Sequence, residues 1–249
     1  MKLPLLVWIL LIISSILFYR FVKDPEIVDL FENIAQFIGL VFVVIYFLRV
    51  RLSKINLQIG KASLLFCFGF SFWAFGQLLV LYSETLLHQI STGSISSVYF
   101  IIGYLLIVGG LYHLAKNSWI ESAAENRKIL HQSALFSSAL ILIIAIIIFN
   151  QIIIPNQTIV YRVLNIVYAI FDLIVIGVTF FLLQVSTRSG KFRERKRYGF
   201  LFLGFIAIGI GNFIGLHAEF GTDLYHLLDV IYVSSYFLIA VAGALFSAG

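Results

Sequence analysis

The stretch Val163–Val185 reads VLNIVYAIFDLIVIGVTFFLLQV and holds a single charged residue, Asp172, among its 23 positions. A helix that crosses a membrane needs about 20 consecutive, mostly apolar residues. The stretch therefore predicts a transmembrane helix with one carboxyl group near its middle.

The composition of the whole chain agrees with a membrane location. Of the 249 residues, 61% are hydrophobic and 12% are charged, and the mean hydropathy is +1.03. A soluble domain carries about 25% charged residues, so the composition excludes a soluble globular protein. The net charge of +5 does not indicate a nucleic-acid partner, because such proteins present their basic residues on a soluble face. The length predicts one membrane domain over residues 1–249.

Eight apolar runs of suitable length predict an all-α polytopic membrane protein with eight transmembrane helices. We interpret the first run as a retained helix, because the bulky residues Phe18–Phe21 stand where a signal peptidase needs small ones. The expected spans are roughly Leu3–Tyr19, Ile34–Leu48, Ala62–Tyr82, Val98–Ala115, Ser133–Phe149, Val163–Val185, Tyr198–Leu216 and Leu228–Ser247.

The basic residues predict the orientation of these spans. With the N-terminus in the cytoplasm, fourteen Lys and Arg residues fall inside and three, Arg20, Lys23 and Arg162, fall outside. Cytoplasmic loops carry an excess of Lys and Arg, so both termini are expected to be cytoplasmic. The acidic residues lie mostly at the outer face, among them Asp29 and Glu32 ahead of the second span.

Two parts of the sequence resemble each other. GQLLVLYSE at Gly76–Glu84 aligns with GNFIGLHAE at Gly211–Glu219 with an offset of 135, and Ser97–Tyr104 aligns with Asp229–Tyr236 with an offset of 132. The match predicts two four-helix repeats. Because each half has an even number of spans, the halves are expected to be parallel, related by an axis along the membrane normal. The repeats are expected at about residues 1–120 and 126–249.

Polar residues recur on equivalent helix faces of the two repeats. Gln77 and Glu84 are seven residues apart and share one face, and Asn212 and Glu219 repeat this spacing. These side chains predict an outward-facing polar pocket that binds a ligand. The alternative is that the amides are hydrogen-bonding glue between helices. The predicted ligand-binding residues are Gln77, Glu84, Tyr104, Asp172, Asn212, Glu219, Asp229, Tyr232 and Tyr236.

Asp172 is the most costly residue of the chain to place in a membrane. A charged side chain at the centre of a span costs at least about 2.5 kcal/mol, so Asp172 is expected to face the helix bundle and to have a partner. A proton relay, an ion site and a ligand contact are functional interpretations, and a neutral, purely structural carboxyl group is the alternative. The candidate partners are Asn165, Tyr168, Gln36 and Asn212.

Enzyme and metal motifs are scarce. His217, Glu219, Asp223 and His226 lie in one outer stretch and are weak candidates for zinc ligands, but a solvated acidic loop is the preferred interpretation and no metal site is predicted. Nucleophile-elbow, phosphate-loop and zinc-protease motifs are missing from the sequence. We therefore expect no enzyme activity and no cofactor, and leave a membrane-embedded metal hydrolase open.

The block Phe72–Gln77, FWAFGQ, and the run Asp229–Tyr232, DVIY, resemble multi-helix membrane modules of bacteria and archaea. Those modules often precede diguanylate cyclase, phosphodiesterase or histidine kinase domains. Their outer loop leads into an Asp-Val-Phe-Tyr-like turn and a Gly-Tyr-Pro, whereas here no Pro follows Tyr104 or Tyr236. The resemblance implies a sensor-like input domain in a prokaryotic cytoplasmic membrane.

The leading functional hypothesis is an integral membrane sensory or signalling module, whose outward-facing pocket is coupled to the cytoplasmic side through a shift in helix packing. A small transporter or channel that uses Asp172, and a structural subunit of a membrane complex, are the alternatives. The expected partners are membrane lipids and a cytoplasmic output domain or partner protein. A homo-oligomer, and a continuation of the last span in a longer chain, are left open.

Overall fold

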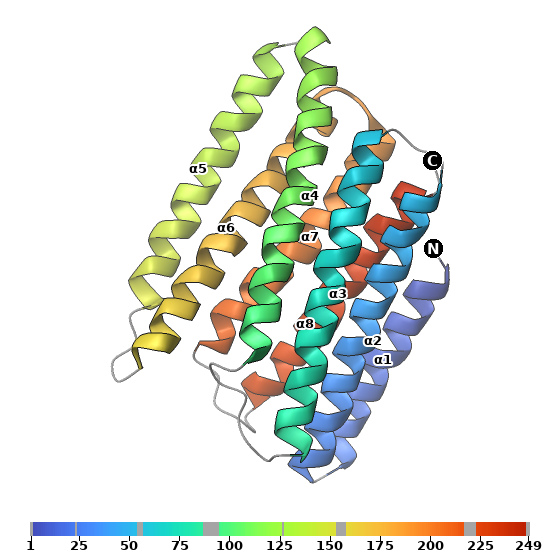
Figure 1. The fold of residues 1–249 in the computed structure, drawn as a ribbon, viewed down its shortest axis with the longest axis vertical. Helices are drawn as coiled ribbons and strands as arrows, with labels where there is room; N and C mark the ends of the chain where they lie inside the picture. The colour runs from blue at the N-terminus through green and yellow to red at the C-terminus, as the bar shows by residue number, and fades with distance from the viewer. Residues whose placement is uncertain are drawn as a thin grey trace.

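The computed structural model describes residues 2–22, 24–53, 57–86, 95–125, 127–152, 158–216 and 223–247, and of residues 2–5, 16, 25–26, 84–86, 121–125, 147–152 and 223–225 only the backbone. Within these ranges the chain forms eight helices and no strand (Figure 1). The helices are α1 (Lys2–Phe21), α2 (Pro25–Leu52), α3 (Leu57–Leu86), α4 (Ile95–Glu125), α5 (Arg127–Ile152), α6 (Ile159–Arg188), α7 (Phe192–Gly215) and α8 (Asp223–Ser247).

Seven of these helices, α2 to α8, are long and apolar enough to cross a membrane. Helix α1 has 20 residues, which include the apolar stretch Leu6–Phe21. The prediction of an all-helical integral membrane protein is therefore confirmed.

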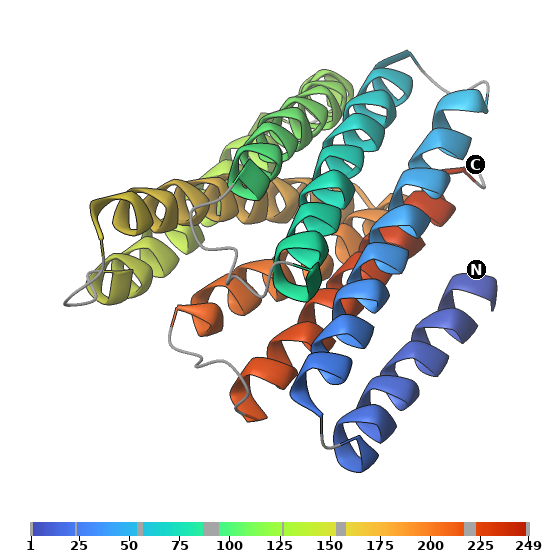
Figure 2. The same cartoon turned by 60° about the horizontal axis from the view of Figure 1, so that its bottom comes forward.

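Six helices form a closed ring, in which α2 packs on α3, α3 on α4, α4 on α6, α6 on α7, α7 on α8 and α8 on α2. Outside the ring, α1 packs against α2 and α8, and α5 packs against α4 and α6. The two outer helices consequently lie on opposite sides of the bundle (Figure 2).

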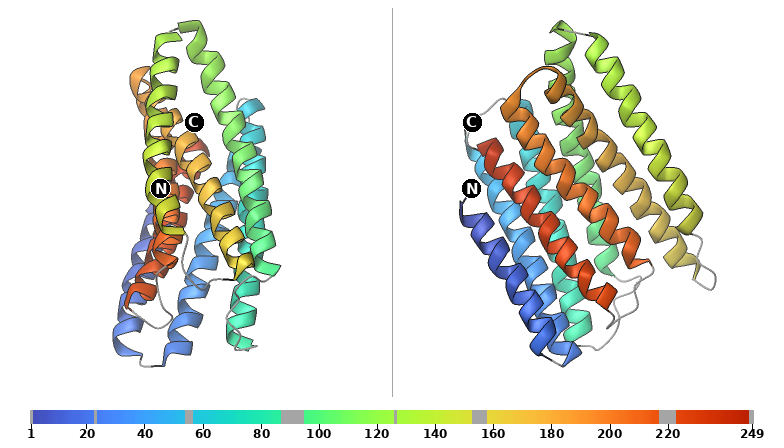
Figure 3. Two further views of the ribbon diagram at one scale, coloured as in Figure 1. Left: turned by 90° about the vertical axis from the view of Figure 1, so that its left-hand side faces the viewer. Right: turned by 180° about the vertical axis from the view of Figure 1, so that it is seen from behind.

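Successive helices run in alternating directions, so α2, α4, α6 and α8 all begin at the same end of the bundle (Figure 3). We call this the acidic end, because Asp24, Asp29 and Glu32 lie near the start of α2. The opposite end, where α2 and α6 finish with Arg51 and Arg188, is called the basic end.

The distribution of side chains suits a chain surrounded by lipid. Large apolar residues are exposed on the outside of the bundle, for example Leu142 and Ile143 of α5. The interior holds a cluster of buried aromatic residues, such as Phe70 and Phe205, whose stacked rings have centroids 6.3 Å apart. Buried polar side chains also lie inside. In a membrane, polar groups face the bundle because lipid offers them no hydrogen bonds.

Small residues allow two helix pairs to approach closely. A Cβ atom added at Gly69 would lie 2.9 Å from the carbonyl oxygen of Gly103, where α3 crosses α4. A Cβ atom added at Gly204 would lie 3.0 Å from the carbonyl oxygen of Ser235, where α7 crosses α8. Both contacts follow the small-residue packing that is typical of transmembrane helices.

The second predicted span requires a correction. The apolar run suggested Ile34–Leu48, whereas α2 begins at Pro25. Proline is favoured in the first turn of a helix, where its missing N–H leaves no hydrogen bond unmade. The earlier start places Asp29 and Glu32, expected in the stretch ahead of the span, inside α2, and both are buried.

Candidate functional site

Four of the predicted ligand-binding residues meet in one hydrogen-bonded group inside the ring. We call this group the central junction. Its members are Tyr104 of α4, Asp172 of α6, Asn212 of α7 and Tyr232 of α8.

The hydrogen bonds of the central junction converge on the carboxyl group of Asp172. The Tyr104 hydroxyl donates to Oδ1 of Asp172 over 2.6 Å, and Nδ2 of Asn212 donates to Oδ2 over 2.8 Å. The same Asn212 nitrogen lies 3.1 Å from the Tyr104 hydroxyl oxygen, and the Tyr232 hydroxyl donates to Oδ1 of Asn212 over 2.8 Å. Both carboxyl oxygens thus accept a hydrogen bond, which offsets part of the cost of burying the group.

These contacts confirm two expectations for Asp172. Its side chain faces the bundle, with an exposed fraction of 4%, and Asn212 is its partner. Tyr168, another candidate partner, lies 3.5 Å from the carbonyl oxygen of Ser97 through its hydroxyl.

Aromatic rings hold Tyr104 in place. Its ring stacks on Phe171, with centroids 5.3 Å apart and planes at 10°, and it meets the edge of Trp73 at 4.7 Å. Nε1 of Trp73 donates to the carbonyl oxygen of Phe100 over 2.9 Å. Because its neighbours are fixed in this way, the Tyr104 hydroxyl has little freedom to leave Asp172.

A second buried polar group lies nearer the acidic end, between α2 and α8. We call it the α2–α8 cluster, and it consists of Asp29, Glu32, His226 and Asp229. Nδ1 of His226 lies 3.0 Å from Oε2 of Glu32, and the Asp229 carboxyl group lies close enough to Glu32 to interact with it electrostatically. One potential ligand atom from each of Asp29, Glu32 and His226 lies within 4.8 Å of the others.

Neighbouring side chains orient the members of the α2–α8 cluster. Nε2 of Gln36 donates to Oδ1 of Asp229 over 2.5 Å. The Tyr19 ring of α1 packs on the His226 ring, with centroids 4.3 Å apart. The cluster is therefore built by three helices.

Helix α8 contributes to both groups. His226, Asp229 and Tyr232 are spaced three residues apart, which puts them on neighbouring turns within roughly 9 Å of helix length. One helix therefore carries members of both polar groups.

The remaining predicted residues have different surroundings. Nε2 of Gln77 donates to Oδ1 of Asn33 over 2.7 Å, which joins α3 to α2. Tyr236 is buried beside Trp73, with ring centroids 6.3 Å apart. The side chains of Glu84 and Asp223, and the whole of His217 and Glu219, lie outside the part of the chain that the structure describes.

The sequence interpretation missed Asp29 and Glu32 as site residues. A signal was present, because Asp29, Glu32, Asn33 and Gln36 follow the spacing i, i+3, i+4 and i+7, which places them on one face of a helix. All four side chains are buried. The signal was missed because the second span was started too late in the chain.

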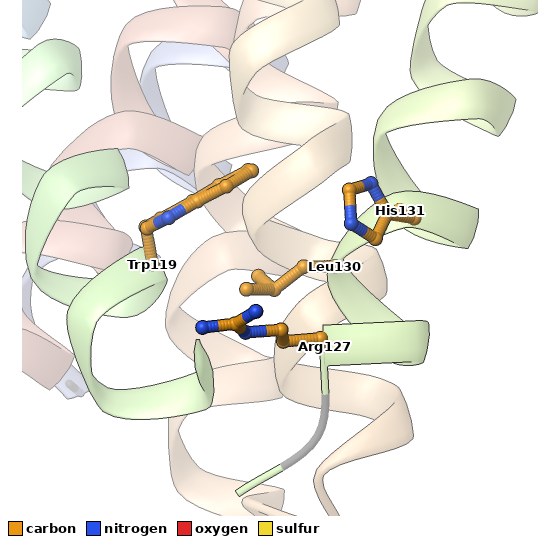
Figure 4. Close-up of a pocket in the computed structure, with 4 residues that line it drawn as sticks. All are labelled: Trp119, Arg127, Leu130 and His131. Carbon is orange, nitrogen blue, oxygen red and sulfur yellow. The ribbon is translucent and has the colours of Figure 1, made fainter. Parts of the chain in front are cut away.

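A cavity of about 260 Å³ lies apart from both polar groups, at the basic end between α4 and α5 (Figure 4). Trp119 of α4 lines one side, and Arg127, Leu130 and His131 of α5 line the other. An indole, a guanidinium and an imidazole group together suit a contact with an anionic headgroup near the membrane surface.

The two buried groups consist of carboxyl, imidazole, amide and phenol side chains that join neighbouring helices through hydrogen bonds. Carboxyl, imidazole, amide and phenol groups can exchange protons or ligate a cation when they are gathered in an apolar interior. No protein-family model, no curated protein and no solved structure matches this chain.

Proposed function

We propose that the protein is an integral membrane sensory or signalling module, in which α8 couples buried polar groups to the cytoplasmic side. The observation that carries the proposal is the participation of α8 in both the α2–α8 cluster and the central junction. An input that rearranges either group changes the hydrogen bonds that hold α8 against its neighbouring helices. Two packing states with different affinities for the input are then enough to produce a signal.

The far end of α8 offers a route for the output. Arg197 of α7 is buried, and its Nε donates to the carbonyl oxygen of Leu245 over 2.9 Å. The guanidinium also lies 5.3 Å from the centre of the Phe246 ring. A displacement along α8 is therefore transmitted to α7 at the basic end, where we place a cytoplasmic output domain or partner protein.

We infer an eight-span topology with both termini in the cytoplasm. Helices α2, α4 and α6 end, and α3, α5 and α7 begin, at the basic end (Figure 1), and most of the Lys and Arg residues lie near these helix ends. The positive-inside rule supports this end as the cytoplasmic one. In this topology α1 is the first span.

We also infer two parallel four-helix repeats, α1–α4 and α5–α8. In this repeat α2 corresponds to α6, α3 to α7 and α4 to α8. Each contact of the ring then has an equivalent contact: α2–α3 corresponds to α6–α7, α3–α4 to α7–α8, and α2–α8 to α6–α4. The close approaches agree, because Gly69 and Gly204 differ by 135 and Gly103 and Ser235 differ by 132. These offsets equal those of the sequence match.

The membrane we propose is a prokaryotic cytoplasmic membrane, as the resemblance to sensor modules implies. Its anionic lipids are proposed partners of the basic stretch around Arg193 and Lys196, since each basic residue near a charged surface contributes about 1 kcal/mol. A homo-oligomer through the lipid-facing sides of α1 or α5 is compatible with this arrangement.

A small transporter or channel is the second candidate function, and one observation favours it. Tyr232 lies one turn beyond Asp229 on α8 and donates to Asn212, which in turn donates to Asp172. These four residues therefore form a series that leads from the acidic end into the bundle. A chain of titratable and amide groups of this kind is typical of proton or cation pathways.

Distance measurements in lipid nanodiscs separate the two candidates. Spin labels at Ser53→Cys and Ser247→Cys, in a Cys67→Ala background, report the separation of α2 and α8 at the basic end. For a signalling module, Asp172→Asn shifts this distance by about 1–2 Å or more, as in other helix-shift transitions, while the exposed control Asp24→Asn leaves it unchanged. An identical distance distribution in Asp172→Asn and the parent protein contradicts the signalling role.

A flux measurement tests the second candidate. Proton flux in liposomes that Asp172→Asn abolishes favours the transporter.

A further inference from the structure

We propose that Asp29, Glu32 and His226 form a binding site for a divalent transition-metal cation, with Zn²⁺ as the best-fitting ion and Asp229 as a further carboxylate. The site lies within the α2–α8 cluster near the acidic end. Metal binding at this place holds whether the protein signals, transports or serves as a subunit.

The candidate ligand atoms of Asp29, Glu32 and His226 lie close together. All three lie within 4.8 Å of one another, and Nδ1 of His226 is 3.0 Å from Oε2 of Glu32. Nitrogen and oxygen ligands bind Zn²⁺ at about 2.0–2.2 Å, so two ligands of one tetrahedral ion are about 3.4 Å apart. The three atoms therefore already lie near the spacing that one ion requires.

The helices present these ligands together for a simple reason. Asp29 and Glu32 are three residues apart on α2, and His226 and Asp229 are three residues apart on α8. Residues at i and i+3 lie on the same side of a helix. Because α2 and α8 pack against each other, the two pairs face one another across a single interface.

The electrostatics of the cluster favour a cation over bare carboxylates. Asp29, Glu32 and His226 are at most 8% exposed, and they sit inside helices long and apolar enough to span the membrane. The Glu32 and Asp229 carboxyl groups lie close enough to repel each other when both are ionised, and Asp29 adds to the same negative charge. A divalent ion can neutralise two carboxylates at once, which removes the cost of burying them unpaired.

The surrounding residues resemble the support of a metal site. Gln36 holds one oxygen of Asp229, and Tyr19 packs over the His226 ring. Such outer contacts orient metal ligands, and their loss typically costs 10–100-fold in affinity. They are present here without any further rearrangement of the helices.

The mixture of donors selects the class of ion. An imidazole nitrogen with two or three carboxylate oxygens suits Zn²⁺ and similar transition-metal ions. Mg²⁺ and Ca²⁺ prefer oxygen ligands alone, so the histidine disfavours them.

The test is direct metal binding to the full chain in detergent or nanodiscs. The protein is treated with EDTA, exposed to ZnCl₂, separated from free metal and analysed for zinc by mass spectrometry, with titration calorimetry for the affinity. We expect one Zn²⁺ per chain, and at least about tenfold weaker binding in His226→Ala and in Glu32→Gln. Two matched controls lie at the basic end, His113→Ala and Glu194→Gln, and they are expected to bind zinc as the parent protein does.

A separate measurement of folding distinguishes loss of the metal ligands from loss of the fold. Helical circular dichroism and the gel-filtration profile identify variants that fold, and saturating Zn²⁺ is expected to raise the Tm of the parent protein but not of folded His226→Ala. The proposal is overturned if the parent protein holds no stoichiometric zinc. It is equally overturned if folded His226→Ala and Glu32→Gln bind zinc with the parent affinity, or if Mg²⁺ displaces Zn²⁺ at equal concentration.

Discussion

The Tyr104 hydroxyl on α4 donates a 2.6 Å hydrogen bond to the Asp172 carboxyl group on α6. Two helices from different halves of the chain are thereby joined at a buried point, and Asn212 and Tyr232 extend the connection to α7 and α8. A polar contact of this kind specifies which helices meet, because lipid offers no hydrogen bonds to a side chain that loses its partner.

Removal of one donor from Asp172 tests the strength of this contact. Tyr104→Phe keeps the ring stacked on Phe171 but leaves Oδ1 of Asp172 without its phenol donor. We expect a loss of about 1–3 kcal/mol in the free energy of unfolding, measured by denaturant titration in mixed micelles. Tyr112→Phe on the exposed side of the same helix is the control, and an equal effect of the two substitutions would contradict the structural role of the Tyr104 hydroxyl.

The α3–α4 contact predicts a large effect of a single methyl group. A Cβ atom at Gly103 would lie 2.2 Å from Cδ1 of Trp73, so Gly103→Ala forces the indole or the helix to move. Overpacking of this kind costs typically 1–3 kcal/mol. At Gly109 the nearest side-chain atom, Cδ1 of Leu65, is 3.4 Å away, and Gly109→Ala should be tolerated in the same unfolding assay.

The inferred repeat predicts that equivalent glycines respond alike. A Cβ atom would meet Cγ1 of Ile107 at 2.9 Å from Gly69, and Cγ1 of Ile239 at 2.5 Å from Gly204. We expect Gly69→Ala and Gly204→Ala to lower the free energy of unfolding by similar amounts, again about 1–3 kcal/mol, in the same denaturant titration. A severe effect in one half together with none in the other would argue against equivalent packing.

The topology can be read from cysteine labelling in intact cells. In a Cys67→Ala background, a membrane-impermeant maleimide should react with Asp24→Cys from outside. It should react with Lys196→Cys only after the membrane is opened, since the basic end is expected in the cytoplasm. Both residues are exposed in the structure, so the order of reactivity depends on orientation. The reverse order would invert the topology.

The sequence carried the main features of the fold. Apolar runs of sufficient length predicted helices that cross a membrane, because each span must satisfy its own backbone hydrogen bonds in lipid. The cost of a buried charge predicted that Asp172 faces the bundle, and Asn212 was among its few polar candidates. These conclusions depend on local properties of single segments, and the structure agrees with them.

The tertiary structure decided which polar groups meet. Gln77 contacts Asn33 and not the central junction, while Glu32 meets His226 across nearly two hundred residues of sequence. Periodicity places residues on a helix face, but the neighbour of that face depends on how helices pack and at what height they cross. Hydropathy also placed the start of α2 too late, because a helix can continue through acidic residues once another helix supplies partners for them. The α2–α8 cluster therefore depends on the packing of α2 against α8, which the sequence of either helix alone does not specify.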